Sequence, residues 1–342
     1  MEEALTRKKA ILLRGGAVQL PAGFQVPFRI SRSTAGPGAG KRSIVFNFHG
    51  LRVKKAIVYD EADFQLIERE GGFSLLHHGQ PFLDEVEIGP VVFHAPEQAF
   101  FNLDQRCIFH CLYCSSPLLG PDATKGLDAE KIVSLTREAM EKTEVGALAL
   151  TSGVHGSVQE TVDRMVECVR LARKEIPDLP IGVEPYVLER EQIVALRKAG
   201  ADEIKINLES PDPEIFRSTC PELDQEHVWR MLEIAVEVFG RGKVASNIIY
   251  GMGESDEIVL AAAERMASLG VVPGLRVLTL NESNRPHVEA ELGPIEAPSI
   301  ERMLHLAREH KRILAAHDLD PREVKSMCFA CTCCDLVPYR DL

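Results

Sequence analysis

From about residue 99 onward, the chain alternates short apolar runs with longer segments in which apolar residues recur at helical spacing. Strands that alternate with amphipathic helices are typical of repeated βα units and a parallel sheet. The candidate strands span residues 99–103, 146–150, 180–183, 203–208, 244–250 and 275–280. The pattern therefore predicts an α/β fold in which six strands and their helices form a partial (β/α)6 barrel.

Capping residues mark the ends of the predicted helices. Asp128 and Ser157 precede helical segments, where a side-chain oxygen can accept a hydrogen bond from an unpaired amide of the first turn. Gly200 and Gly270 follow two other segments, as expected of glycine at a helix C-terminus. These signals support helices rather than loops between the strands.

The first 98 residues follow a different pattern. Segments with alternating apolar and polar residues predict a small β-rich domain; they span residues 43–48, 52–59, 73–77 and 86–93. The glycine-rich stretch 35–40 lacks the preceding strand and following helix of a phosphate-binding loop, so we interpret it as a flexible loop.

At the other end, an amphipathic helix is predicted from Ser299 to about residue 317, followed by a cysteine-rich tail. We therefore expect three parts: an N-terminal β-rich domain (1–98), a partial barrel (99–298), and a C-terminal helix with a metal-binding tail (299–342).

Composition narrows the function classes. A formal net charge of -12 argues against a nucleic-acid duplex or an anionic membrane as the main partner, because both favour a basic face. No apolar run approaches the ~20 residues that a membrane span needs. The first residues carry no long apolar stretch with a cleavage site, so we expect a cytoplasmic protein.

The nine cysteines are grouped rather than spread along the chain. Grouped cysteines in a reducing compartment more often bind metal than form disulfides. Cys168 lies inside a predicted helix, where packing is the favoured interpretation. Cys220 lies in a loop, where an inert thiol and a ligand or sulfur-relay role both stay open. Two groups remain: Cys107, Cys111 and Cys114, and Cys328, Cys331, Cys333 and Cys334.

The first group has the spacing C-x3-C-x2-C. Such a loop can place three thiolates on three irons of one [4Fe-4S] cluster, which leaves the fourth iron free to chelate a substrate or cofactor. The alternative is a structural zinc site that would use His110 as its fourth ligand.

Polar residues follow the other predicted strands, and in parallel barrels the reactive groups lie at these carboxyl ends. The set comprises Thr151-Ser152-Gly153, Glu184, Asn207 and Glu209, Gly251 to Glu254, and Asn281 to Pro286. Any one carboxylate of this set is equally consistent with a solvated barrel rim, but their shared position beside the cysteine loop favours a binding site.

The cysteine loop, with Tyr113 before its last cysteine, resembles that of the radical S-adenosylmethionine (SAM) superfamily. Residues 206–210 (INLES) and 250–255 (YGMGES) resemble motifs of lipoyl synthases, so the chain is similar to the biotin synthase and lipoyl synthase branch over residues 99–285. The resemblance implies a SAM-binding [4Fe-4S] cluster on the three cysteines, which are catalytic together with Glu209. It also implies cofactor binding by Tyr113, Ser152, Gly153, Glu184, Asn207, Glu209 and Glu254.

The sequence also departs from that branch. The N-terminal C-x4-C-x5-C motif and the closing Arg-Ser-Ser-Tyr of lipoyl synthases are absent, and C-x2-C-x-C-C stands near the C-terminus instead. Four thiols within seven residues favour a metal, either an auxiliary [4Fe-4S] cluster or zinc held by all four. Beside a radical SAM site, the iron-sulfur interpretation is favoured.

These features predict an enzyme that reductively cleaves SAM to a 5'-deoxyadenosyl radical and inserts sulfur into unactivated C–H bonds. The resemblance points to a lipoyl synthase-like sulfurtransferase acting on an octanoylated carrier, with a ferredoxin or flavodoxin as reductant and a second radical SAM subunit as partner. One alternative is a maturase or carbon-skeleton enzyme whose tail cluster relays electrons. Another is a non-catalytic metal-binding scaffold.

Overall fold

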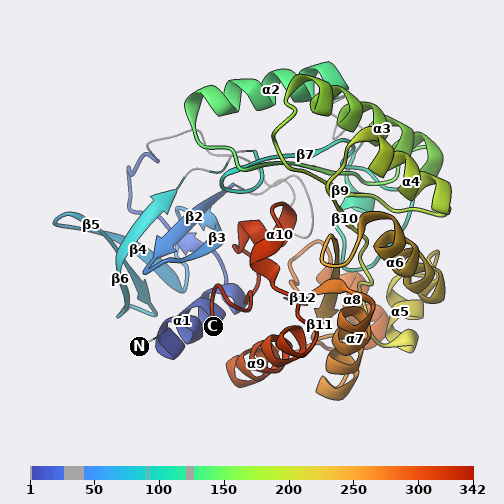
Figure 1. The fold of residues 1–342 in the computed structure, drawn as a ribbon. Helices are drawn as coiled ribbons and strands as arrows, with labels where there is room; N and C mark the ends of the chain where they lie inside the picture. Colours follow the sequence, from blue (N-terminus) through green and yellow to red (C-terminus); the bar gives the residue numbers. More distant parts are fainter. Residues whose placement is uncertain (1, 27–41, 90, 92, 121–126) are drawn as a thin grey trace.

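A computed structural model describes residues 2–26, 42–89, 91, 93–120 and 127–342. Its larger part is a six-stranded parallel sheet in the order β12-β11-β10-β9-β8-β7, curved into a partial barrel with helices on its convex side (Figure 1). The strands are β7 (Gln98–Asn102), β8 (Ala147–Thr151), β9 (Ile181–Glu184), β10 (Glu203–Lys205), β11 (Val244–Tyr250) and β12 (Val271–Val277). The predicted α/β partial barrel is confirmed.

The helices of the barrel begin and end where the capping residues predict. The Asp128 carboxylate accepts from the amide of Lys131 at the start of α2, and the Ser157 hydroxyl accepts from that of Glu160 in α3. Gly200 ends α4 in the left-handed conformation, and Gly270 does so for α7. The barrel helices are α2 (Ala129–Lys142), α3 (Val158–Glu175), α4 (Arg190–Ala199), α5 (Pro213–Thr219), α6 (Gln225–Phe239), α7 (Asp256–Leu269) and α8 (Arg285–Leu292).

Two strands differ from their predicted bounds by more than one residue. The fourth, β10, ends at Lys205 rather than at residue 208, because the amide of Leu208 donates to the Ser246 hydroxyl at 3.0 Å instead of to a backbone carbonyl. The sixth, β12, begins at Val271, directly after Gly270, and pairs in register with β11 from its first residue. Residues 278–280, predicted as strand, therefore follow it.

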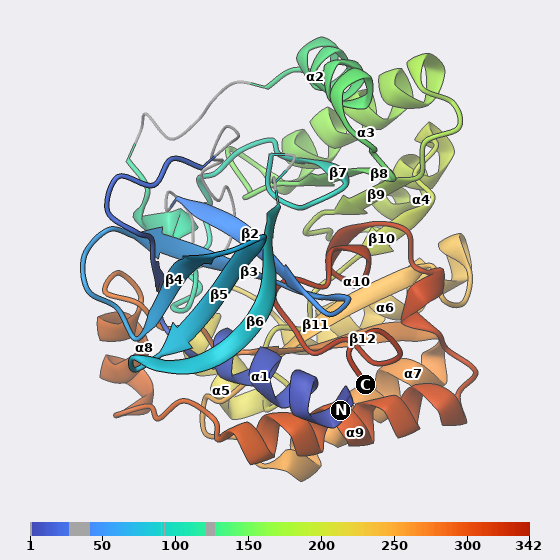
Figure 2. The ribbon, with the colours of Figure 1, turned by 90° about the vertical axis from the view of Figure 1, so that its left-hand side faces the viewer.

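The N-terminal part forms a closed six-stranded barrel, as Figure 2 shows most clearly. Its strands are β1 (Val18–Gln19), β2 (Ser43–Phe48), β3 (Leu51–Val58), β4 (Phe64–Arg69), β5 (Gly72–His77) and β6 (Gln80–Gly89). The predicted β-rich character is confirmed, whereas the strand β4 and the helix α1 (Glu2–Arg14) were not predicted. The last strand predicted for this part, residues 86–93, is shifted toward the C-terminus relative to β6, which spans 80–89. The glycine-rich stretch 35–40 lies outside the described residues.

The C-terminal tail lies on the concave side of the parallel sheet. After α9 (Ile300–Ala316), the chain turns back and forms the short helix α10 (Met327–Cys331) between the sheet and the N-terminal barrel (Figure 1). A side chain on Gly182 of β9 would place Cβ 2.0 Å from the Ser326 hydroxyl, so glycine there makes room for the tail. The two termini of the chain lie close together beside α9.

Polar side chains fix this position of the tail. The Glu203 carboxylate accepts from the Ser326 hydroxyl at 2.6 Å, and Gln98 exchanges two hydrogen bonds with the backbone of Met327 at 2.8 and 3.0 Å. From α1, the Lys9 ammonium donates to the Asp341 carboxylate and to the Thr332 carbonyl, each at 2.7 Å. The side chain of Lys9 is fully buried, so this ion pair joins α1 to the C-terminal tail and holds the tail in place.

No helix in the described ranges combines the length and apolar character that crossing a membrane requires.

Candidate active site

The first cysteine group lies on a loop at the carboxyl edge of the parallel sheet, directly after β7. Two backbone hydrogen bonds hold the loop to its neighbours: the amide of Ile108 donates to Val154 at 2.8 Å, and that of Leu112 donates to Thr219 at 2.9 Å. Neither bond involves a thiol. The loop therefore presents three half-buried thiols on a backbone that is held independently of them: Cys107, Cys111 and Cys114.

Ser152 and Gly153, at the end of β8, join that strand to the cysteine loop. The Gly153 amide donates to the Asp104 carbonyl at 2.7 Å, and the Asp104 amide donates to the Ser152 hydroxyl at 3.2 Å. A Cβ on Gly153 would lie 2.1 Å from the Arg106 carbonyl, so only glycine permits this approach. Both residues lie at the predicted place; their contact with a cofactor stays a prediction.

Tyr113 and Cys220 form a buried contact behind the loop. The Tyr113 hydroxyl and the Cys220 sulfur are 3.2 Å apart, and the Cys220 thiol also hydrogen-bonds Cys111. Cys220 is completely buried. The hydrogen bond with Cys220, together with burial, raises the pKa of Cys111 well above its usual value. The sequence left the role of Cys220 open, and the structure places it against the cysteine loop.

A chain of polar side chains runs along the concave face of the sheet below this loop. The Glu184 carboxylate accepts from the Asn207 amide and from the Lys205 ammonium, each at 2.8 Å. Burial disfavours the charged form of Glu184, but the Lys205 charge and these hydrogen bonds keep its pKa below the usual value. The structure thus brings Glu184 and Asn207 together, as their shared position at strand ends predicts.

Glu209 lies at the end of this row of polar side chains that is nearer to the cysteine loop. Its backbone has φ +67°, an unfavourable conformation for a residue with a side chain, and is held by hydrogen bonds with Asn247 and Ile249. Burial raises the pKa of Glu209 to about 7, and the nearby Lys205 opposes this shift. A carboxyl group that titrates near neutral pH beside the cysteine loop is a candidate for binding or proton exchange.

Glu254 has a different environment from the other carboxylates. Its oxygens accept from the amides of Gly251 at 2.6 Å and Met252 at 2.9 Å, and Arg302 of α9 pairs with it at 3.0 Å. The side chain is buried and closes its own loop after β11. These contacts explain why a glutamate is needed there; its predicted contact with a cofactor stays a prediction.

The tail cysteines lie inside the partial barrel, below the polar chain. The Cys328 sulfur accepts from the Lys205 ammonium at 3.4 Å and from the Arg276 guanidinium at 3.3 Å. Cys331 and Cys333 are buried in an apolar cluster that includes Val45 of the N-terminal barrel. A hydrogen bond with Cys333 lowers the pKa of Cys331 to about 6.

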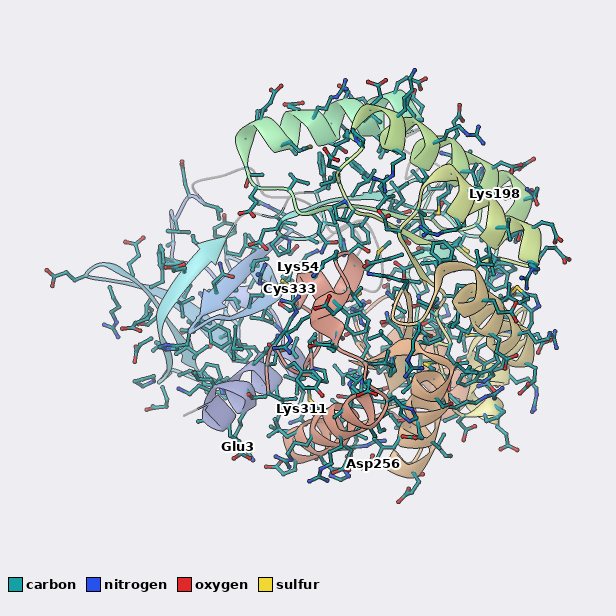
Figure 3. The ribbon with its side chains drawn as sticks, in the orientation of Figure 1. Glu3, Lys54, Lys198, Asp256, Lys311 and Cys333 are labelled. Carbon is teal, nitrogen blue, oxygen red and sulfur yellow. The ribbon has the colours of Figure 1, made fainter. Side chains whose placement is uncertain are left out.

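The N-terminal barrel also contacts this group. The amide of Lys54 in β3 donates to the Cys333 carbonyl at 3.1 Å, and the two residues lie side by side in Figure 3. Residues from three distant parts of the chain thus enclose the tail cysteines.

Lys205 and Arg276 lie beside the candidate site and were not predicted from the sequence. The sequence does contain a signal for Lys205. Residues 203–209 read Glu-Ile-Lys-Ile-Asn-Leu-Glu, in which every second residue is polar. Such alternation indicates that one face of the strand is polar. Arg276 lies between apolar residues of β12 and offers no comparable pattern.

Across the described ranges, no three His, Cys, Asp or Glu side chains are already gathered in an arrangement that could hold a metal ion. The metal-binding assignment of both cysteine groups therefore stays a prediction.

Comparison with known proteins shows which family part of the chain resembles. The sequence profile of the radical SAM superfamily matches residues 102–266. A biotin synthase of Streptococcus agalactiae serotype V is 26% identical over 176 residues, which cover 48% of this chain and 49% of that protein. A biotin synthase of Campylobacter jejuni is 29% identical over 172 residues, which cover 48% and 59%. Over these residues the chain is similar to the radical SAM superfamily, and in particular to its biotin synthase branch.

Solved structures agree on the fold. The FeFe-hydrogenase maturase HydG from Carboxydothermus hydrogenoformans superposes with a TM-score of 0.51 at 18% identity, covering 64% of this chain and 51% of that one. Methylornithine synthase (PylB) gives 0.51 at 18% identity, covering 62% of each chain. The chain spans about half the length of the biotin synthase from S. agalactiae that it matches.

Similarity to this superfamily implies a [4Fe-4S] cluster with SAM. The residues present fit that group: three thiols share one loop, and a glycine that tolerates no Cβ fixes the loop against β8. Cys107, Cys111 and Cys114 would hold it.

Proposed function

We propose that this chain is a SAM-dependent enzyme that inserts sulfur into unactivated C–H bonds, with a lipoyl synthase-like action on an octanoylated carrier. The observation that carries the proposal is the row of polar side chains that leads from the strand-end residues to the tail cysteines. It runs from Asn207 through Glu184 and Lys205 to the sulfur of Cys328. A substrate bound at the strand ends would thus lie between a radical source and a group of thiols.

When bound, a [4Fe-4S] cluster with SAM supplies a carbon radical that can take hydrogen from an unactivated carbon. The chain's own residues provide the surroundings. Glu209 and Asn207 offer a carboxylate and an amide that can bind ammonium and hydroxyl groups. The N-terminal barrel and the tail lie on the concave side of the sheet and cover part of this region.

The tail cysteines fit an auxiliary [4Fe-4S] cluster. Such a cluster with thiolate ligands is anionic, and Lys205 and Arg276 place two positive charges beside the Cys328 sulfur. The position of this group inside the barrel, rather than on the surface, supports a role with the substrate. Cys328, Cys331, Cys333 and Cys334 would be the ligands. The likeness to biotin synthases supports sulfur chemistry.

The proposal is tested by the origin of the sulfur. The enzyme is reconstituted anaerobically with iron and isotopically labelled sulfide, freed of excess label, and given SAM, a reductant and an octanoylated carrier peptide. We expect product that carries the label, and loss of cluster sulfide that matches product formation. If the tail cluster relays electrons instead, sulfide is retained and the peptide gains no labelled sulfur, which would contradict the proposal. A non-catalytic scaffold would not cleave SAM.

The raised pKa of Glu209 gives a pH prediction. A protonated carboxyl group must lose its proton before it can bind the cationic part of SAM as a carboxylate. Below about pH 7, SAM affinity should therefore rise up to tenfold per pH unit as pH increases, and level off above the pKa. Glu209→Gln should lower the affinity by about 1–3 kcal/mol at pH 8 and flatten this profile.

Asn207→Ala provides the control for this measurement. It should weaken binding by a similar 1–3 kcal/mol, because a polar partner is lost, but keep the pH dependence. Anaerobic equilibrium binding of SAM to the cluster-loaded variants measures both effects. An unchanged slope in Glu209→Gln would assign the titration to another group.

A further inference from the structure

Cys328 differs from the other tail cysteines in what surrounds its sulfur. Cys331 and Cys333 are buried among apolar side chains, with Cys334 packed against the same cluster. The Cys328 sulfur instead lies within hydrogen-bonding distance of two cations, Lys205 at 3.4 Å and Arg276 at 3.3 Å. The tail therefore faces the parallel sheet with a sulfur that is hydrogen-bonded to two cations, whereas its other three thiols pack in or against the apolar cluster.

The two cations are fixed by the sheet. Lys205 lies on β10 with a side chain only 3% exposed, and its ammonium is also held by Glu184 at 2.8 Å. Arg276 lies on β12, and its guanidinium donates two hydrogen bonds to Asp335 at 3.1 and 2.9 Å. Each cation thus shares its donors between a carboxylate and the same sulfur, and each carboxylate restricts the direction in which the cation points.

This arrangement has an electrostatic consequence. Positive charges at hydrogen-bonding distance from a ligand sulfur stabilise added negative charge, and in a water-poor interior the effect is poorly screened. Hydrogen bonds to ligand sulfurs are among the factors that set the reduction potential of an iron-sulfur cluster. Lys205 also contacts Glu184, which binds Asn207, so the side of the tail that carries the Cys328 sulfur is the side that adjoins the strand-end site.

We propose that Lys205 and Arg276 are positioning residues for the tail cluster, which hold the Cys328 sulfur on the strand-end side and raise the cluster's reduction potential. This inference rests on the proposed function, since it requires that the tail binds an iron-sulfur cluster. It also assigns different roles to the tail cysteines: Cys328 holds the edge that adjoins the strand-end site, and the other three hold the edge enclosed by the N-terminal barrel.

The test uses the full chain with Cys107, Cys111 and Cys114 all replaced by Ala, so that only the tail can carry a cluster. After anaerobic reconstitution, the reduction midpoint is measured by potentiometric titration with EPR detection. Lys205→Met and Arg276→Met in this background should each shift the midpoint to more negative values, because the reduced cluster loses a stabilising charge. Lys205→Arg, which keeps the charge, should have a midpoint close to that of the parent chain.

Lys243→Met is the matched control. Lys243 is a lysine that pairs with the Glu203 carboxylate of β10 at 3.7 Å, but it is half exposed and makes no hydrogen bond to a tail sulfur. Its removal changes the net charge equally and should leave the midpoint unchanged. Loss of tail iron from folded Lys205→Met, with Lys205→Arg and Lys243→Met still loaded, would also support the inference.

Two results would contradict different claims. If the parent chain with the three Ala replacements takes up no iron-sulfur cluster, the proposed auxiliary cluster itself is wrong. If it does take up the cluster, but Lys205→Met and Arg276→Met keep the parent midpoint, the positioning role of the two cations is overturned while the proposed function stands. Thermal unfolding of each variant verifies that the compared proteins are folded.

Discussion

Replacing Cys111 with Ala should abolish formation of 5'-deoxyadenosine from SAM. The three thiols of the loop would have to ligate three irons of one cluster, and a loop of this spacing has no fourth cysteine to replace a missing one. The fold should persist, because the loop is held by the backbone bonds of Ile108 and Leu112 rather than by its sulfurs. Anaerobic product analysis and thermal unfolding, carried out on the same preparation, measure the two effects separately.

Cys168→Ala is the control for this substitution. Cys168 is buried in the middle of α3, where it packs against the barrel core, so its loss should change stability only modestly and leave SAM cleavage intact. Cys107→Ala and Cys114→Ala should behave like Cys111→Ala. SAM cleavage that survives in Cys111→Ala would show that the loop does not provide three essential ligands.

The barrel could be predicted because its signals are local. A buried strand of parallel sheet is a short apolar run, and helix caps need only a residue and its near neighbours in sequence. This is why Asp128, Ser157, Gly200 and Gly270 mark the helix ends correctly. The bounds of β10 could not be predicted in the same way, because its end depends on a hydroxyl of Ser246, some forty positions further on.

The helix α1 escaped prediction for a related reason. Its buried face carries Thr6 and Lys9, which serve as hydrogen-bond donors to the far end of the chain. A lysine on the buried side weakens the apolar stripe by which an amphipathic helix is detected. The sequence alone contains no sign that the buried partner of Lys9 is Asp341.

In the candidate site, too, the features with local signals could be predicted, whereas those that depend on long-range contacts could not. The cysteine groups and the strand-end residues follow from motif spacing and from the general placement of reactive groups in parallel barrels. The position of the tail could not be predicted in this way. It depends on contacts such as that of Glu203 with Ser326, which join residues more than a hundred positions apart. Lys205 acquires its partner Cys328 only through this packing.

Replacing Cys328 and Cys331 together with Ala should separate sulfur insertion from SAM cleavage. The two residues lie on different sides of the tail, Cys328 beside the cations and Cys331 in the apolar cluster, so the double variant removes a ligand from each. Iron content should fall from about eight to about four atoms per chain, if each cysteine group holds one [4Fe-4S] cluster. SAM cleavage should continue, because the first cysteine group is unchanged, whereas product with inserted sulfur should disappear.

The tail itself should stay in place in this variant. Ser326 is held by Glu203 and Met327 by Gln98, and neither contact uses a sulfur of the cysteine group. A chain of over 300 residues also has a core large enough to fold without a metal. Cys168→Ala, which leaves both cysteine groups intact, should keep about eight irons and form product. This control shows that the lost activity of the double variant comes from the tail cysteines and not from the loss of any thiol. Zinc in the tail of anaerobically purified protein, or sulfur-containing product from the double variant, would refute the role of the tail as sulfur donor.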